Sequence, residues 1–185
     1  MKMRKTLALA AAAWLASGAA LADGLPAGTL ITGQVSGAST VLLGLDHGFA
    51  DEPGSNTAAL AAADLEFLTG DYALGVDFGT DGRVQVWNNT GTSLVPGSYT
   101  LSFEFSGLAG EITDFTLLDG ATGVTVQVLG PHAISLSFSN LDFGSEYGSF
   151  AAQISVSPVP EPASLALMGA GLALLAGARR VRRPA

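Results

Sequence analysis

The sequence predicts an all-β fold, an antiparallel β-sandwich or jelly roll of about 8–10 strands, followed by a C-terminal transmembrane helix. Three observations lead to this prediction. Apolar and polar residues alternate in many short segments, turn-forming residues separate these segments, and a charge-free stretch near the C-terminus ends in arginines. Strands do not alternate with long helical patterns, so a parallel α/β sheet is not expected.

The stretch GSYTLSFEFSG, residues 97–107, carries the clearest alternation. Tyr99, Leu101, Phe103 and Phe105 fall on one face, and Ser, Thr and Glu fall on the other. This period of two is typical of a strand with one buried face. Further strands are predicted at residues 29–35, 39–45, 72–78, 83–87, 112–119, 124–128, 134–138 and 153–157. Turns are expected at residues 80–82, 95–97, 119–120 and 130–131.

One segment does not show this alternation throughout. Ser55 or Asn56 is suited to cap a helix, alanines follow, and Gly70 is suited to end it. These residues suit a short helix over residues 57–68, but the alternation at residues 64–67 also permits a strand for the second half. We therefore expect a short helix or a loop that runs into a strand.

The N-terminal residues resemble a secretory signal peptide in their physical pattern. Three basic residues within the first five precede an apolar run at residues 7–16, and Ala20 and Ala22 stand at the spacing that a signal peptidase accepts. As a helix the apolar run would cover about 15 Å, half of a bilayer core. We expect residues 1–22 to be a signal peptide cleaved after Ala22, and residues 23–157 to be the folded body.

Charge is distributed unevenly along the chain. The region between Asp23 and Pro160 holds fifteen acidic residues and one basic residue, Arg83, a formal charge of −14. Nucleic acid is therefore not an expected partner, because binding its backbone requires clustered Lys and Arg. Neutral or cationic polymers and divalent cations fit better. Because the chain has no Cys, the body must be stabilised by a packed core without disulfides.

Candidate metal and catalytic residues give only weak patterns, and no cofactor or metal site is expected. Residues 77–82 faintly resemble a calcium loop, but Gly79 stands at the third position and Asn88 at the twelfth, where a bidentate Glu would sit, so a hairpin turn is favoured. His47 follows Asp46 and precedes Asp51 and Glu52, while His132 lies far away in the sequence. Neither a metal cluster nor a Ser-His-Asp triad follows from this spacing.

Asp64 and Glu66 form the one carboxylate pair with a spacing of catalytic interest. In a strand they would share a face about 6 to 7 Å apart, near the separation that glycoside hydrolysis uses. No adjacent residue indicates a raised pKa, so we expect no catalytic residues and no enzymatic activity.

Two further patterns concern the surface of the body. Asn88-Asn89-Thr90 matches a glycosylation acceptor, but a turn is the favoured interpretation. Four aromatic residues are available to stack on a sugar, of which Tyr99 is expected in the core; they are Tyr72, Trp87, Tyr99 and Tyr147.

The C-terminal region has three parts. Residues 158–162 contain three prolines and predict a stiff linker. Residues 163–178 carry no charge and predict a transmembrane helix of about 24 Å, which snorkelling arginines would extend towards the roughly 30 Å of a bilayer core. Residues 179–185 form a cytoplasmic tail with Arg179, Arg180, Arg182 and Arg183, so that the body lies on the far side of the membrane.

Val159-Pro160-Glu161-Pro162, the apolar stretch and the arginine cluster together resemble the PEP-CTERM sorting signal of exopolysaccharide-producing Gram-negative bacteria. The resemblance covers about the last 28 residues. It implies that an exosortase, a membrane-embedded processing enzyme, recognises the chain near Pro160, Glu161 and Pro162. It further implies that the tail is removed and the body passes from the inner membrane to the cell surface or extracellular matrix.

The leading functional hypothesis is an exported, non-enzymatic protein at the cell surface or in the exopolysaccharide matrix, with a structural or biofilm role and extracellular polysaccharide as a candidate partner. The alternatives are a carbohydrate- or calcium-binding lectin-like module and a secreted glycoside hydrolase.

Overall fold

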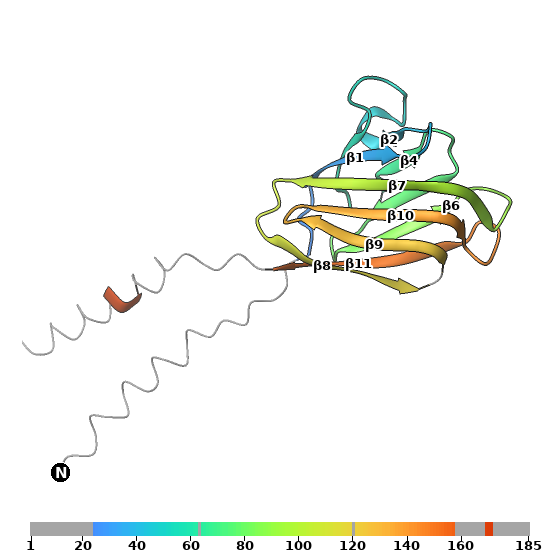
Figure 1. The fold of residues 1–185 in the computed structure, drawn as a ribbon. Helices are drawn as coiled ribbons and strands as arrows, with labels where there is room; N and C mark the ends of the chain where they lie inside the picture. The colour runs from blue at the N-terminus through green and yellow to red at the C-terminus, as the bar shows by residue number, and fades with distance from the viewer. Residues whose placement is uncertain (1–23, 63, 120, 158–168, 172–185) are drawn as a thin grey trace, which may run out of the picture. The chain divides into compact units, whose positions relative to one another are not determined.

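Two antiparallel β-sheets form the body of this chain in a computed structural model that describes residues 24–62, 64–119, 121–157 and 169–171 (Figure 1). One sheet has five strands in the order β3-β1-β7-β10-β9, and the other has six in the order β2-β4-β5-β6-β11-β8. All the paired strands are antiparallel. The predicted all-β sandwich is therefore confirmed.

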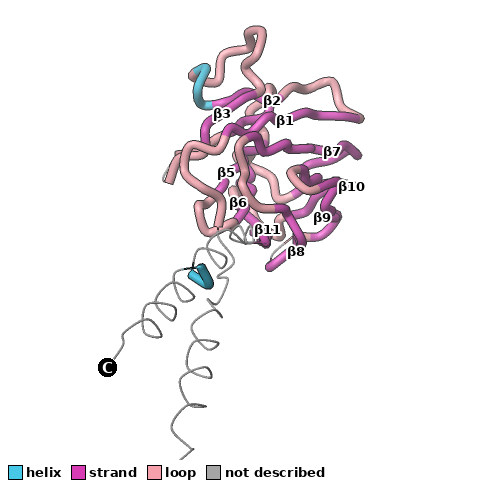
Figure 2. The backbone as a smooth tube through the Cα atoms, turned by 90° about the vertical axis from the view of Figure 1, so that its left-hand side faces the viewer, coloured by secondary structure: helices cyan, strands magenta, loops and turns pink. Residues whose placement is uncertain are grey.

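The five-stranded sheet consists of β3 (Thr57–Ala59), β1 (Leu30–Ser36), β7 (Leu94–Ser106), β10 (Ala133–Asp142) and β9 (Thr122–Gly130). The six-stranded sheet consists of β2 (Leu42–Gly44), β4 (Phe67–Thr69), β5 (Leu74–Phe78), β6 (Arg83–Asn88), β11 (Ser149–Ser157) and β8 (Glu111–Asp119). A 3-10 turn, η2 (Leu45–His47), follows β2. Figure 2 shows β7, β10 and β9 in one layer and β5, β6 and β11 in the other.

The order of the strands is nested in the way of a jelly roll. β7 pairs with β10 in one sheet, and the strands next to them in the chain, β6 and β11, pair in the other. Each long pairing thus closes over a long stretch of chain, and the two sheets are joined by several crossings. The sandwich is held by contacts between residues far apart in the sequence.

Aromatic side chains from both sheets fill the core. Phe103 of β7 packs against Phe67 of β4 and Phe78 of β5, with ring centroids 5.4 and 5.0 Å apart. At the other part of the core, Phe138 of β10 lies 6.3 Å from Phe150 of β11. Tilted and edge-to-face rings at such distances attract one another beyond the effect of burial alone. The alternation predicted for residues 99–105 is confirmed, since the predicted inward side chains are buried or half-buried.

The helix predicted over residues 57–68 is wrong. Thr57–Ala59 forms β3, which pairs with Leu30–Thr32 of β1, and Phe67 begins β4. The Asn56 side chain, expected as a cap, donates a hydrogen bond to the Gly33 carbonyl at 2.9 Å instead. Helix propensity is a weak preference, and the backbone hydrogen bonds that β1 offers at its open edge outweigh it here.

Several strands, including β7, β5 and β11, also differ in their bounds from the prediction. β7 starts at Leu94 and continues through Pro96 and Gly97, where a turn was expected. The pairing register of β10 shifts between Ser139 and Leu141 opposite this segment, and the Asn140 side chain accepts a hydrogen bond from the Gly97 N–H at 3.2 Å. Such a bulge accommodates a proline within a sheet. β5 starts at Leu74 rather than at residue 72.

The predicted transmembrane helix at residues 163–178 lies outside the described residues, apart from the helical residues 169–171. Among the parts of the chain that the structure describes, no helix combines the length and the apolar composition that crossing a bilayer requires.

Candidate functional site

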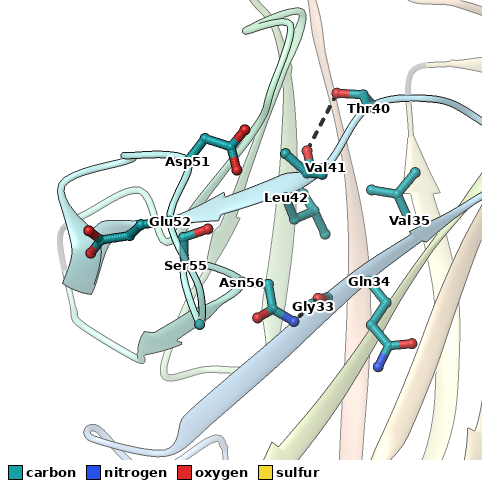
Figure 3. Close-up of a pocket in the computed structure, with 11 residues that line it drawn as sticks. Gly33, Gln34, Val35, Thr40, Val41, Leu42, Asp51, Glu52, Ser55 and Asn56 are labelled. Carbon is teal, nitrogen blue, oxygen red and sulfur yellow. Dashed lines mark hydrogen bonds between the residues drawn. The ribbon is translucent and has the colours of Figure 1, made fainter.

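A shallow polar pocket of about 370 Å³ lies between the edge of β1, the start of β2 and the loop at residues 51–56 (Figure 3). The side chains at its rim with oxygen or amide groups are those of Gln34, Thr40, Asp51, Glu52, Ser55 and Asn56. The hydrogen bond from Asn56 to Gly33 fixes the loop to β1 and thereby shapes one wall. A ligand here would meet carboxylates and amides, which are hydrogen-bonding groups for hydroxyls.

His47 lies in η2 beside this loop. Its Nδ1 is 2.8 Å from Oε1 of Glu52, in a partly exposed pair. His132 lies in the turn between β9 and β10, where Phe105 donates a backbone hydrogen bond to its carbonyl. The structure therefore does not bring the two histidines together. Within the described residues, no group of three or more His, Cys, Asp or Glu side chains is arranged to hold a metal ion.

Residues 77–82 form the expected hairpin turn between β5 and β6. The Gly79 N–H donates to the Arg83 carbonyl at 2.7 Å, and Gly82 has a φ of 83°. The Asp81 carboxylate accepts a hydrogen bond from the Arg83 N–H at 3.0 Å. The Asp-Gly pair therefore acts as a turn former, because glycine adopts a positive φ without strain.

Glu66 is the most unusual titratable residue of the body, with a side chain that is fully buried. Its Oε1 accepts a hydrogen bond from the Ala61 N–H at 3.0 Å, and its Oε2 accepts one from the Phe78 N–H at 2.8 Å. Burial raises its pKa to about 7, and the nearby charge of Asp77 also raises it, against the effect of the two hydrogen bonds.

The shared strand face considered for Asp64 and Glu66 does not form. Both lie before β4 rather than in a strand, with Asp64 exposed and Glu66 enclosed. The expectation that nothing raises a pKa there is also wrong, since burial does so for Glu66. The sequence does not show this because the Ala61 and Phe78 backbones meet the carboxyl group only after folding. Asp77 is the carboxyl group whose charge acts on Glu66, and burial raises the pKa of Asp77 as well.

Asn88 organises the loop that follows β6, as the interpretation of residues 88–90 as a turn predicted. Its buried side chain accepts hydrogen bonds from the Thr90 N–H at 3.0 Å and the Thr90 hydroxyl at 2.7 Å, and it donates one to the Thr92 carbonyl at 2.6 Å. All of its hydrogen-bonding positions but one are thus engaged within the loop.

The four aromatic residues named from the sequence divide into two groups. Tyr99 packs against Phe138 with ring centroids 5.1 Å apart, and burial raises the pKa of its hydroxyl, as does the charge of Asp71. Its placement in the core is therefore confirmed. The other three are exposed on the outer side of the six-stranded sheet or its adjoining loops, namely Tyr72, Trp87 and Tyr147.

The residues predicted for sorting and processing lie outside the described residues. These are Ala20, Ala22, Pro160, Glu161, Pro162, Arg179, Arg180, Arg182 and Arg183. What the structure does show is the end of the body, where Ser157 of β11 pairs with Glu111 of β8. The final strand thus ends three residues before Pro160.

A family profile described as the PEP-CTERM protein-sorting motif matches residues 158–183. The match includes all the sorting residues predicted from the C-terminal sequence and begins directly after β11. It supports an exported protein that an exosortase processes at the membrane. Comparison with curated proteins and with solved structures gives no match.

Proposed function

Because residues 158–183 of this chain are a PEP-CTERM sorting motif, we propose that an exosortase removes the tail near Pro160-Glu161-Pro162. The released chain, which contains the body at residues 23–157, is then displayed at the cell surface or in the exopolysaccharide matrix, where it has a structural, non-catalytic role. Before processing, the apolar segment at residues 163–178 holds the chain in the inner membrane, and the arginines keep its C-terminal end in the cytoplasm with the body on the outer side.

The position of the motif relative to the fold is the observation that carries this proposal. β11 ends at Ser157, and residues 22–158 form one compact unit that contains all the strands described. Cleavage at Pro160 to Pro162 would therefore leave every pairing of the two sheets intact. A sorting signal that is to be discarded needs this separation from the core.

The chemistry of the body supports a non-catalytic role. The only side chain whose pKa is raised to about 7 is Glu66 among the described residues, and both of its oxygens accept backbone hydrogen bonds inside the protein. A general acid must reach the substrate directly or through one water. Glu66 is enclosed and serves the backbone instead.

Mass spectrometry of the protein isolated from a host that contains an exosortase tests this proposal. The expected surface form ends near residues 158–162, and the substitution of Pro160 and Pro162 by alanine retains the tail. Pro184→Ala is the matched control, because Pro184 lies outside the matched residues. A surface form that still carries Arg183 contradicts the proposal.

A further inference from the structure

Three large aromatic side chains are exposed at one end of the six-stranded sheet. Trp87 exposes 46% of its surface, Tyr72 exposes 53% and Tyr147 exposes 64%. Single exposed apolar residues are common, but three aromatic ones close together indicate a surface that contacts something. We call these three residues the aromatic platform.

The sheet register brings the three residues to the same end. Trp87 lies on β6 opposite Gly75 of β5 on one side and opposite Ser149 of β11 on the other. Tyr72 precedes β5, and Tyr147 precedes β11. Because β5 and β11 both run antiparallel to β6, both tyrosines lie where β6 ends.

Backbone hydrogen bonds fix this arrangement through the loop after Trp87. Asn89 donates from its backbone to the Ala73 carbonyl at 2.9 Å and from its side chain to the Tyr72 carbonyl at 3.0 Å. On the other side of the loop, the Tyr147 N–H donates to the Thr90 carbonyl at 3.3 Å. The internal hydrogen bonds of Asn88 hold the loop itself. The platform is therefore built on an organised part of the fold.

Both tyrosines adopt a backbone conformation that bulky residues rarely adopt. Tyr72 has a φ of 57° and Tyr147 a φ of 52°. Asn or Gly would occupy these positions with less strain. Because both tyrosine side chains are exposed, packing in the core does not explain why a tyrosine stands at either position. Strained residues of this kind cluster at binding sites. The strain is an observation independent of exposure.

Polar groups continue the platform along β6. Gln85, two residues before Trp87 and on the same face, donates a hydrogen bond to the Ser149 hydroxyl at 2.8 Å. Arg83, two residues further along the same face, donates to the Gln85 side chain at 3.2 Å. An aromatic surface beside amide and hydroxyl groups matches a sugar ring, which has an apolar C–H face and a rim of hydroxyls.

The negative charge around the aromatic platform favours neutral polymers over anionic ones. Asp71 and Glu146 directly precede the two tyrosines, and the region from Asp23 to Pro160 has a formal charge of −14. This field repels polyanions and opposes close association of two copies of the chain. A neutral polymer experiences neither repulsion.

We propose that Tyr72, Trp87 and Tyr147 bind a neutral polysaccharide chain by stacking on its sugar rings, with Gln85 and Ser149 as hydrogen-bonding partners. The proposal deepens the proposed function, on which it rests, by assigning the surface that would hold the body in an exopolysaccharide matrix. An open, exposed platform suits a long polymer that runs past it, whereas a small sugar would gain few contacts there.

Co-sedimentation of the full-length chain with insoluble cellulose, curdlan and starch tests the proposal, in a detergent without a sugar headgroup. We expect binding to at least one of these neutral polymers and weaker binding to carboxymethyl cellulose, its anionic counterpart. Trp87→Ala should weaken the affinity about tenfold, which equals about 1.4 kcal/mol and is the size of one aromatic contact. Trp87→Phe should retain most of the binding.

Two further sets of variants separate binding from folding. Leu129→Ala is the matched control, because Leu129 is 54% exposed on β9 of the other sheet. Tyr72→Asn and Tyr147→Asn should weaken binding without lowering Tm, because Asn tolerates a positive φ. A purely structural role for the tyrosines would instead lower Tm.

The outcomes that overturn the proposal are distinct. They are no binding to any of the three neutral polymers, unchanged binding by Trp87→Ala, equal binding to carboxymethyl cellulose, or a dimer that Trp87→Ala abolishes. Tail removal in the Trp87→Ala chain, measured by mass spectrometry, tests the proposed function separately. If the tail is removed normally and only binding fails, the platform is wrong and the sorting proposal stands.

Discussion

The Glu66 side chain accepts a hydrogen bond from the Phe78 backbone N–H at 2.8 Å, just beyond the end of the pairing between β4 and β5. The last paired residues there are Phe67 and Val76. Beyond them, the Glu66 carboxyl group, rather than a backbone carbonyl of β4, accepts the hydrogen bond from β5. Its second oxygen accepts from the Ala61 N–H at 3.0 Å. Glu66 thus satisfies two backbone donors that a short strand leaves without a partner.

The first prediction concerns the pH dependence of stability. Folding raises the pKa of Glu66 from 4.5 to about 7. Between these two pH values, the Glu66 carboxyl group is protonated in the folded state and ionised in the unfolded state. The stabilisation from this group is therefore fully present below about pH 4.5 and is lost as pH rises through about 7. Between about pH 5 and about pH 8, the free energy of unfolding of the unmodified protein should fall by about 3 kcal/mol more than that of Glu66→Gln. Urea denaturation of both proteins over this range measures the difference, and parallel curves would contradict the prediction.

The second prediction concerns what Glu66→Gln does at low pH. Gln has one acceptor oxygen, so it can serve either Ala61 or Phe78 but not both. One buried N–H then lacks a partner, and the variant should be less stable by about 1–3 kcal/mol at about pH 5. Asp64→Asn is the control, because Asp64 is exposed in the same loop and should change stability by less than about 0.5 kcal/mol.

The third prediction concerns Gly44, at the end of β2. A Cβ atom there would lie 2.0 Å from the backbone oxygen of Thr57, which cannot move without disturbing β3. Gly44→Ala should therefore destabilise the fold by about 2–4 kcal/mol. Gly130→Ala is the control, since nothing lies within 4 Å of its Cβ position. Thermal denaturation compares the two variants. Equal Tm values would contradict the prediction, because they would show that β3 can shift at little cost in stability.

The fourth prediction concerns the aromatic contacts between the sheets. Phe103 is almost fully buried and packs against Phe67 and Phe78 of the opposite sheet. Phe103→Ala leaves a cavity and should cost about 3–5 kcal/mol. The exposed Leu129 again supplies the control, with less than about 0.5 kcal/mol expected for Leu129→Ala. A loss below about 1 kcal/mol for Phe103→Ala in urea denaturation would mean that the core closes around the gap.

The fifth prediction links Asn88 to binding. Asn88→Ala removes the three hydrogen bonds that hold residues 88–92, and it should lower stability by about 1–3 kcal/mol. Because this loop joins the backbones of Tyr72 and Tyr147, polysaccharide binding should also weaken in the protein that remains folded. Co-sedimentation with the neutral polymer that the unmodified chain binds, corrected for the folded fraction by circular dichroism, measures this. Full binding by the folded fraction would show that the loop does not position the tyrosines.

Much of the fold could be predicted from the sequence because strand formation leaves a local pattern. The alternation over residues 99–105 identified β7 and its buried face, and Asp81-Gly82 identified the hairpin between β5 and β6. Residues 57–68 could not be predicted in this way, because their alanines have helix propensity while the strand pairing of Thr57–Ala59 depends on β1, about 27 residues away in the chain. Pro96 likewise has the local pattern of a turn, and only the register shift between β7 and β10 makes it compatible with a sheet.

The sorting signal and the all-β class of the body follow from the amino-acid sequence alone. Both depend on the order of residue types along the chain: prolines, apolar residues and arginines in one case, and a period of two in the other. Which polar residues matter within the body depends instead on how the strands pack. Glu66 differs from Asp64 because it is buried and bonded to the Ala61 and Phe78 backbones. Trp87, Tyr72 and Tyr147 lie at the same end of the sheet because β5, β6 and β11 are neighbours. Burial and proximity of this kind arise from strand pairing across long stretches of chain, which no local pattern records.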